Sequence, residues 1–100
     1  MISNNTATQV VSSDQTVLFQ NFPNPFKESS VIEYYLHAPG DVTLTVSDAL
    51  GKIVLRIRNE NMSQGKHAVQ LTNKNLSGGC YVYQLTTGNF TDTKRMMVIR

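Results

Sequence analysis

The side chains able to carry chemistry are few in this chain of 100 residues, and their spacing does not match a metal or catalytic site. His37 and His67, the two histidines, are 30 residues apart and lack the local spacing of a zinc site. Asp41 and Asp48 do not follow the alternating ligand positions of a calcium loop. We expect His37 to lie on the surface near a turn and His67 to be partly packed where a strand begins.

Motifs for nucleophilic or phosphate chemistry do not occur either. Ser77 has no Gly-x pair before it and lacks the strand–Ser–helix context of a nucleophile elbow. Gly78 and Gly79 are not followed by the Lys and helix of a phosphate-binding loop. Asp48 and Glu60 could share a face, but nothing places an acid and a base around a cleft. We therefore expect no catalytic residue, no metal and no cofactor, and interpret the chain as a non-enzyme.

Length and composition indicate one small globular domain with a single core. Hydrophobic residues make up 40% of the chain and charged residues 16%. The net charge of +2 is too small to favour a nucleic-acid partner. There is neither an apolar run near the roughly 18 residues of a membrane span nor a signal-peptide pattern. The chain is then either cytosolic or part of a longer protein whose export signal lies elsewhere. Cys80, the single cysteine, excludes an internal disulfide and is interpreted as a small hydrophobe on a buried strand.

The elements that must position any site are β-strands, and the most strongly patterned one covers 80–85. In it Tyr81, Tyr83 and Leu85 point one way, while the residues between them point the other. Two tyrosines and a leucine on one face carry a large apolar area. We interpret this segment as a central strand whose tyrosine face is covered by the rest of the chain.

Six further segments have strand patterns, and none has a helical period. They cover 17–21, 30–36, 42–47, 52–57, 67–71 and 90–100. Seven short strands near ten-residue spacing predict an all-β fold, a seven-stranded antiparallel immunoglobulin-like β-sandwich, with a small barrel as the open alternative. Residues 59–66 are predicted as a loop. Residues 1–16 are predicted as a flexible polar linker or leader before the domain at 17–100, unless Val10 and Val11 join a first edge strand.

Turn residues separate these strands. Pro23 and Pro25 cannot lie inside a sheet, so Phe22 to Phe26 should form a stiff turn whose two phenylalanines pack onto the core. Asp48 can accept backbone amides ahead of it and Gly51 can take positive φ, which predicts a hairpin turn. A second tight turn is expected at 86–89.

The last seven residues, 94–100, combine basic and apolar side chains. Met96 and Val98 should share one face, and Met97 and Ile99 the other. As a closing edge strand, its charges would discourage pairing with other sheets. Alternatively, a partner reads this segment by strand addition or by capturing its carboxylate.

Five segments occur together in the order and spacing of a known family: 19–26, 32–36, 48–52, 76–81 and 94–100. Over about Val17 to Arg100 the chain resembles the C-terminal sorting domain of the type IX (Por) secretion system, type A. Departures are small. Lys27 and Glu28 replace a second Asn-Pro, Ser77 replaces a frequent Pro, and Cys80 replaces a commoner Val.

The resemblance implies a non-catalytic, immunoglobulin-like module at the C-terminus of a larger exported protein of Gram-negative cells. Its partners would be the type IX translocon, sortase proteins and a covalently attached N-terminal cargo domain, with no nucleic acid and no membrane span. The cargo would travel through the periplasm and outer membrane to be secreted or held at the cell surface. A sortase would cleave in the polar stretch before Val17 and attach the cargo to anionic lipopolysaccharide. The residues matching the family's recognition signal are Asp48, Gly51, Gly79, Tyr81, Lys94, Arg95, Met96, Met97, Val98, Ile99 and Arg100.

A structural or adhesive immunoglobulin-like module is the alternative, either carbohydrate-binding or a spacer like that of the flagellar-hook cap. A carbohydrate binder should display a flat, exposed aromatic strip, for which Tyr35 and the 81–83 tyrosines are the candidates. The sorting hypothesis instead predicts that deleting Met96 to Arg100 leaves the sandwich largely folded but abolishes export.

Overall fold

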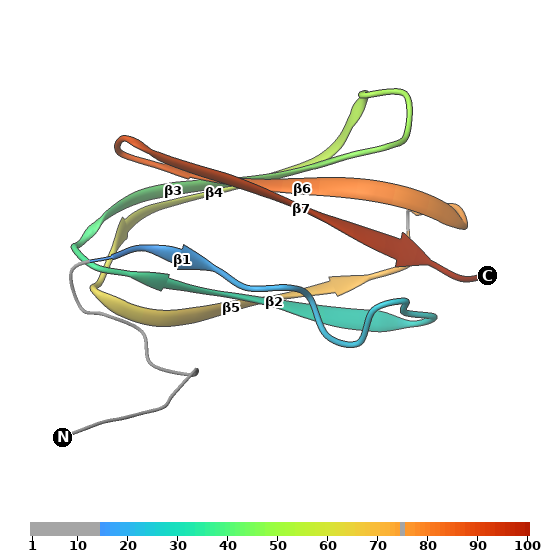
Figure 1. Cartoon of the computed structure of the whole chain (residues 1–100), viewed down its shortest axis with the longest axis horizontal. Helices are drawn as coiled ribbons and strands as arrows, with labels where there is room; N and C mark the ends of the chain where they lie inside the picture. The colour runs from blue at the N-terminus through green and yellow to red at the C-terminus, as the bar shows by residue number, and fades with distance from the viewer. Residues whose placement is uncertain (1–14, 75) are drawn as a thin grey trace, which may run out of the picture.

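The computed structural model describes residues 15–74 and 76–100, and the regular structure in them is entirely β (Figure 1). Two antiparallel sheets face each other, one with the order β1-β2-β5 and the other with the order β4-β3-β6-β7. The prediction of a seven-stranded, two-sheet sandwich is confirmed within this part of the chain. The strands are β1 Val17–Leu18, β2 Ser29–Leu36, β3 Gly40–Ser47, β4 Ile53–Met62, β5 Gly65–Thr72, β6 Gly79–Thr87 and β7 Phe90–Val98.

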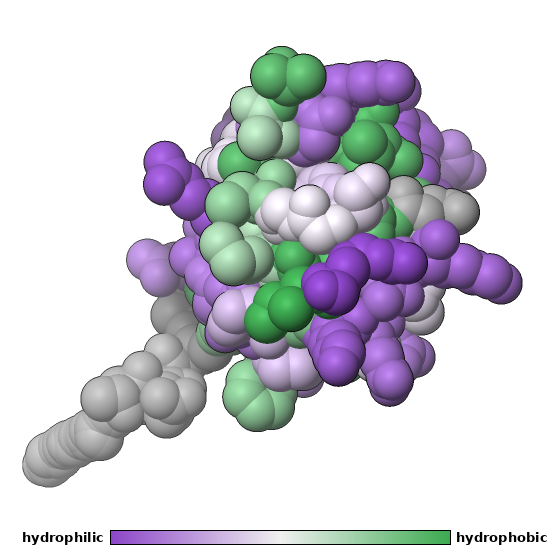
Figure 2. Space-filling model, turned by 90° about the vertical axis from the view of Figure 1, so that its right-hand side faces the viewer, coloured by the Kyte–Doolittle hydropathy of each residue, from purple (hydrophilic) through white to green (hydrophobic). Residues whose placement is uncertain are grey.

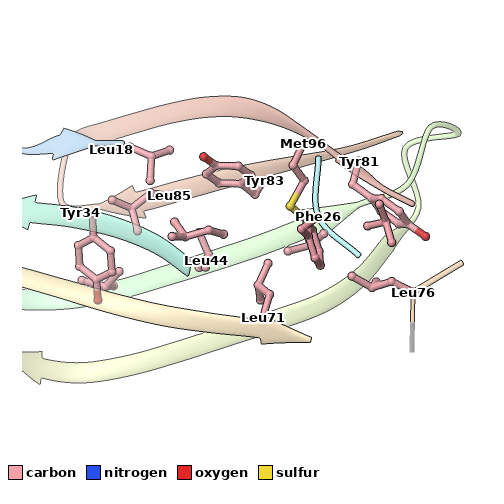
Figure 3. Close-up of a cluster of buried hydrophobic side chains, with 14 of the residues drawn as sticks. Leu18, Phe26, Tyr34, Leu44, Leu71, Leu76, Tyr81, Tyr83, Leu85 and Met96 are labelled. Carbon is pink, nitrogen blue, oxygen red and sulfur yellow. The ribbon is translucent and has the colours of Figure 1, made fainter. Parts of the chain in front are cut away.

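The core lies between the two sheets because the strands alternate apolar and polar side chains. β6 lies between β3 and β7 in its sheet, and its Tyr81, Tyr83 and Leu85 are buried (Figure 3). From the facing sheet, Tyr34 of β2 and Leu71 of β5 also enter this core. The predicted central strand and its buried tyrosine face are therefore confirmed.

One polar cluster is part of this core. The Tyr83 hydroxyl donates to the carbonyl of Phe19 at 2.8 Å and accepts the Asn21 N–H at 2.7 Å. The buried Asn21 amide donates to Ser30 Oγ at 2.9 Å and to the Pro23 carbonyl at 3.1 Å. Ser30 Oγ donates to the same carbonyl at 2.8 Å. These bonds satisfy buried polar groups and fix the segment after β1 onto β2 and β6.

The Phe22–Phe26 turn differs from the prediction at one of its two phenylalanines. Phe26 is buried in the core, but Phe22 is 79% exposed. Phe22 and Val31 exchange two backbone hydrogen bonds of 2.9 Å, and paired residues share a face of the sheet. Val31 lies on the outer face of β2, so its partner Phe22 faces outward as well. Both proline bonds of the turn are cis.

The predicted loop at 59–66 is wrong. β4 continues to Met62 and β5 begins at Gly65, so the two strands form a hairpin. Asn59 and Arg58 still pair with β3, and backbone bonding on an edge strand needs no apolar alternation. The lack of an alternating hydrophobic pattern in 59–66 therefore did not indicate a loop. The predicted leader at 1–16, with the alternative strand at Val10 and Val11, lies outside the described residues except for its last two positions.

Candidate functional site

Three segments that the sequence singled out meet at one end of the sandwich, which we call the C-terminal end. The turn at 48–52 follows β3, β6 begins there, and β7 ends there (Figure 1). The pairing of β6 with β3 and β7 explains why the three segments lie together, since Ser47 lies opposite Val82 and Gly79 lies opposite Val98. Lys94 pairs with Tyr83 further along the sheet and is the one predicted recognition residue set back from this end.

Asp48 and Gly51 form the turn that the sequence predicted. Asp48 Oδ1 accepts the backbone N–H groups of Leu50 and Lys52, both at 2.9 Å. Gly51 donates its N–H to the Asp48 carbonyl at 3.0 Å and has a φ of 87°, which favours glycine. The Asp48 carboxylate is thus engaged with its own turn, and Leu50 projects from it with 94% of its surface exposed.

Gly79 and Tyr81 shape the start of β6. Tyr81 is buried, and its hydroxyl donates to the Ser77 carbonyl at 2.8 Å, which closes the turn before the strand. Gly79 has a φ of 149°. A Cβ at the neighbouring Gly78 would lie 3.4 Å from the side chain of Arg100, so the terminal residue packs closely over this turn. Tyr81 is therefore a core residue, whereas Gly79 is exposed at the start of β6.

The terminal segment alternates as predicted. Met96 and Val98 are buried, while Met97 is 43% exposed and Ile99 46% exposed. The Arg100 guanidinium donates to the carbonyls of Asn73 at 2.9 Å and Leu76 at 3.0 Å, so its position is fixed. Deleting 96–100 would remove the buried side chains of Met96 and Val98, so we now expect this deletion to destabilise the sandwich.

An open groove of about 520 Å³ crosses the outer face of β6 and β7 at the C-terminal end. Figure 2 views the molecule from this end, where hydrophobic side chains alternate with hydrophilic ones. Arg95 also borders the groove, which gives it a positive rim. Its mainly apolar lining includes Pro25, Ala49, Cys80, Val82 and Met97.

Cys80 is exposed in this groove, so its interpretation as a buried residue is wrong. The alternation placed Cys80 correctly on the face opposite to that of Tyr81, but within residues 15–74 and 76–100 no second layer covers that face of the sheet. Sequence reasoning also missed Asn24 and Pro25, which line the groove from the turn after β1. Two alternating prolines predicted a turn there, and only the tertiary fold reveals what it contacts.

The titratable groups of the core are tyrosines. Burial raises the pKa of Tyr83 to about 12; the hydrogen bond with the Asn21 backbone acts in the lowering direction, and the charge of Asp92 in the raising direction. Burial also raises the pKa of Tyr34, whose ring lies 5.5 Å from that of the half-buried His67. His37 is exposed, so both histidines lie as predicted. Among residues 15–74 and 76–100, no three potential metal ligands lie together, and no helix is long and apolar enough to cross a membrane.

Two other features bear on the alternative functions. The aromatic strip of a carbohydrate binder is not formed, because Tyr81 and Tyr83 are buried and Tyr35 is only partly exposed. A larger hollow of about 770 Å³ lies at the opposite end, lined by turn residues such as His37 and Gly88. Among the described residues that line it, His37 and Asp41 are the ionisable ones.

Comparison with known proteins identifies a family over most of the chain. Residues 20–99 match the model of the secretion system C-terminal sorting domain. A similar solved structure is that of PorZ, an essential bacterial surface component of the type-IX secretion system of Porphyromonas gingivalis. The two are 15% identical with a TM-score of 0.58, and the match covers 83% of this chain but only 11% of that chain. This similarity supports the fold. No curated protein matches the chain.

Proposed function

This chain belongs to the family of type IX secretion system C-terminal sorting domains, and we propose that it sends an attached cargo through the outer-membrane translocon to the cell surface. The family is one of non-catalytic secretion signals, and we assign this chain no reaction of its own. The observation that carries the proposal is the family match over 20–99, together with the meeting of three family segments at one end of the sandwich.

We assign the proposed recognition residues two different tasks. Arg95, Met97 and Ile99 have exposed side chains at the C-terminal end and would contact the secretion machinery. The others would shape that surface. Asp48 and Gly51 would do so through their turn, and Gly79 and Tyr81 through the start of β6. Met96 and Val98 would act from the core, Lys94 through β7, and Arg100 through its bonds to the carbonyls of Asn73 and Leu76. A surface with an apolar centre and a positive rim suits a protein partner.

The chain enters the domain at the end opposite to this surface. Gln15 and Thr16 line the hollow beside the start of β7, whereas the groove lies near the end of this nine-residue strand. A cargo attached before Val17 would therefore leave the groove open to a partner. In the same proposal, residues 1–16 form the linker, 17–100 form the sorting domain, and a sortase cleaves in the linker before attaching the cargo to lipopolysaccharide.

The test is export of a reporter. The chain is fused to the C-terminus of a fluorescent protein that carries a periplasmic signal peptide, and expressed in a type IX-competent bacterium and its translocon-deficient mutant. We expect surface or medium fluorescence only in the competent strain, and mass spectrometry should find the new C-terminus of the reporter within residues 1–16. Equal export from both strains, or retention in both, would contradict the sorting role. Export without cleavage would contradict only the sortase step.

A further inference from the structure

We infer that Gln20, Asn24 and Phe26 form a clasp, which occupies the backbone hydrogen-bonding groups on the outer edge of the C-terminal strand. The secretion machinery would then recognise this strand by its side chains and not by adding a β-strand. The inference rests on the proposed function and specifies how its recognition site is presented. It argues against strand addition, one of the modes of recognition that the sequence left open for the terminal segment.

Four hydrogen bonds make the clasp. Gln20 Nε2 donates to the Arg95 carbonyl at 2.7 Å, and the Met97 N–H donates to Asn24 Oδ1 at 2.9 Å. The Phe26 N–H donates to the Met97 carbonyl at 3.0 Å, and the Ile99 N–H donates to the Phe26 carbonyl at 2.8 Å. Phe26 forms a parallel bridge with Val98 through the last two bonds.

These bonds use every outward backbone group from the Arg95 carbonyl to the Ile99 N–H. In a strand, the N–H and C=O of every second residue point to the same side, and the inner side of β7 is paired with β6. The outer side of this stretch therefore belongs to Arg95, Met97 and Ile99. Strand addition requires free groups on an edge, and here the clasp occupies them.

The clasp is itself anchored in the core. Phe26 is buried between the sheets (Figure 3), and the Tyr83–Asn21–Ser30 hydrogen bonds hold the chain just before it. Gln20 also donates to Asn21 Oδ1 at 2.7 Å. The clasp is therefore a fixed part of the fold, and an incoming strand would have to break core contacts to displace it.

The row of side chains on the outer face remains accessible to a partner. Met97 and Ile99 are roughly half exposed, and Arg95 adds a positive charge beside them. The complementary partner surface is a protein pocket that accepts the two apolar side chains and carries a carboxylate near Arg95. This combination, and not a free sheet edge, is the chemistry that we assign to the recognition step.

Substitutions at Asn24 test the clasp, because this side chain is exposed and its loss removes no core contact. Asn24→Leu removes the acceptor of the Met97 N–H, whereas Asn24→Asp keeps an oxygen there. In the full chain, we expect amide hydrogen exchange of Met97 to become roughly fivefold faster or more in Asn24→Leu, with Ile32 and Val69 unchanged. Asn24→Asp should exchange like the wild type, and an unchanged Met97 rate in Asn24→Leu would overturn the clasp.

Export of the reporter fusion tests how the strand is read. Gln20→Ala opens the edge at the Arg95 carbonyl without changing a residue that lines the groove. It should lose most export, whereas its control Gln70→Ala on the exposed face of β5 should retain it. Export at or above the wild-type level in Gln20→Ala would favour strand addition and overturn the inference. Failure of the wild-type fusion to be exported would contradict the proposed function, while the exchange data still decide on the clasp.

Discussion

Tyr83 connects the core to the clasp, because its ring fills the core and its hydroxyl holds the segment that forms the clasp. It is fully buried, and its hydroxyl has both a donor and an acceptor partner. We expect Tyr83→Ala to lower the free energy of unfolding by roughly 3–5 kcal/mol, from the cavity and the orphaned Asn21 N–H. Urea denaturation measures this, and a loss below about 1 kcal/mol would mean that the ring is not central to the core.

The same tyrosine predicts an alkaline instability. Burial raises the pKa of Tyr83 from 10.0 to about 12, so the folded state holds this proton more tightly than the unfolded chain. The resulting stability is fully present below pH 10 and is lost as the pH rises towards 12. Melting temperatures between pH 9 and about 12 should fall less steeply in Tyr83→Phe than in the wild type. Identical pH slopes for Tyr83→Phe and the wild type would contradict ionisation of Tyr83 as the cause of the alkaline instability.

Gly51 tests the turn at the C-terminal end. A Cβ there would meet nothing within 4 Å, so the effect of a side chain comes from the backbone φ of 87° alone. We expect Gly51→Val to destabilise by about 1–3 kcal/mol, because a β-branched residue is strained at positive φ. Gly51→Asn should lose less, since Asn tolerates this region. Thermal melting that ranks the two variants equally would contradict the strained turn.

At the residue scale, alternation in the sequence predicted the buried faces well and the coverage of the opposite faces poorly. Tyr81, Tyr83 and Met96 are buried as their spacing indicated. Cys80 and Phe22 were expected in contact with the core but are exposed. Period-two spacing tells which side chains share a face, whereas a second layer over that face is a property of the whole sandwich.

At the scale of elements, the terminal strand belongs to the core and also forms the proposed recognition surface. Removing 96–100 takes away Met96, Val98 and the strand end that pairs with Gly79 to Tyr81. We expect this deletion to destabilise the domain by roughly 4 kcal/mol or more, much of a typical total of 5–15 kcal/mol. Removing Arg100 alone should lower stability by only about 1–2 kcal/mol, through its two carbonyl bonds. Circular dichroism melts that leave the longer deletion native-like would contradict the assignment of β7 to the core.

The sequence predicted most elements, and its errors have a common cause. Strands with one buried face were found, as was the Asp48 turn, whose side-chain bonds are local. The β4–β5 hairpin and the clasp were missed, because backbone pairing on an edge and the contacts of Asn24 depend on residues far away in the chain. The candidate site was therefore predicted as separate motifs, and the fold supplied their meeting at one end.

At the scale of the whole molecule, the proposed cargo attachment and the proposed recognition surface lie at opposite ends of the sandwich. The chain enters near β1, at the end opposite to the 48–52 turn and the end of β7 (Figure 1). The groove, which is lined by Ala49 and Met97, lies beside that turn. In the proposed role, the cargo would be attached at the first end, and the secretion machinery would bind at the second. The central claim is that recognition depends on the exposed side chains of the second end.

The most direct measurement of that claim is the exported fraction of the reporter fusion for Met97→Asp and for its control Val54→Asp. Both positions are partly exposed hydrophobics on edge strands, but Val54 does not line the groove. We expect similar melting temperatures for the two variants, with each stability loss below about 1 kcal/mol. Export should fall at least tenfold in Met97→Asp and remain near the wild-type level in Val54→Asp. Equal export of the two folded variants would contradict recognition through this surface.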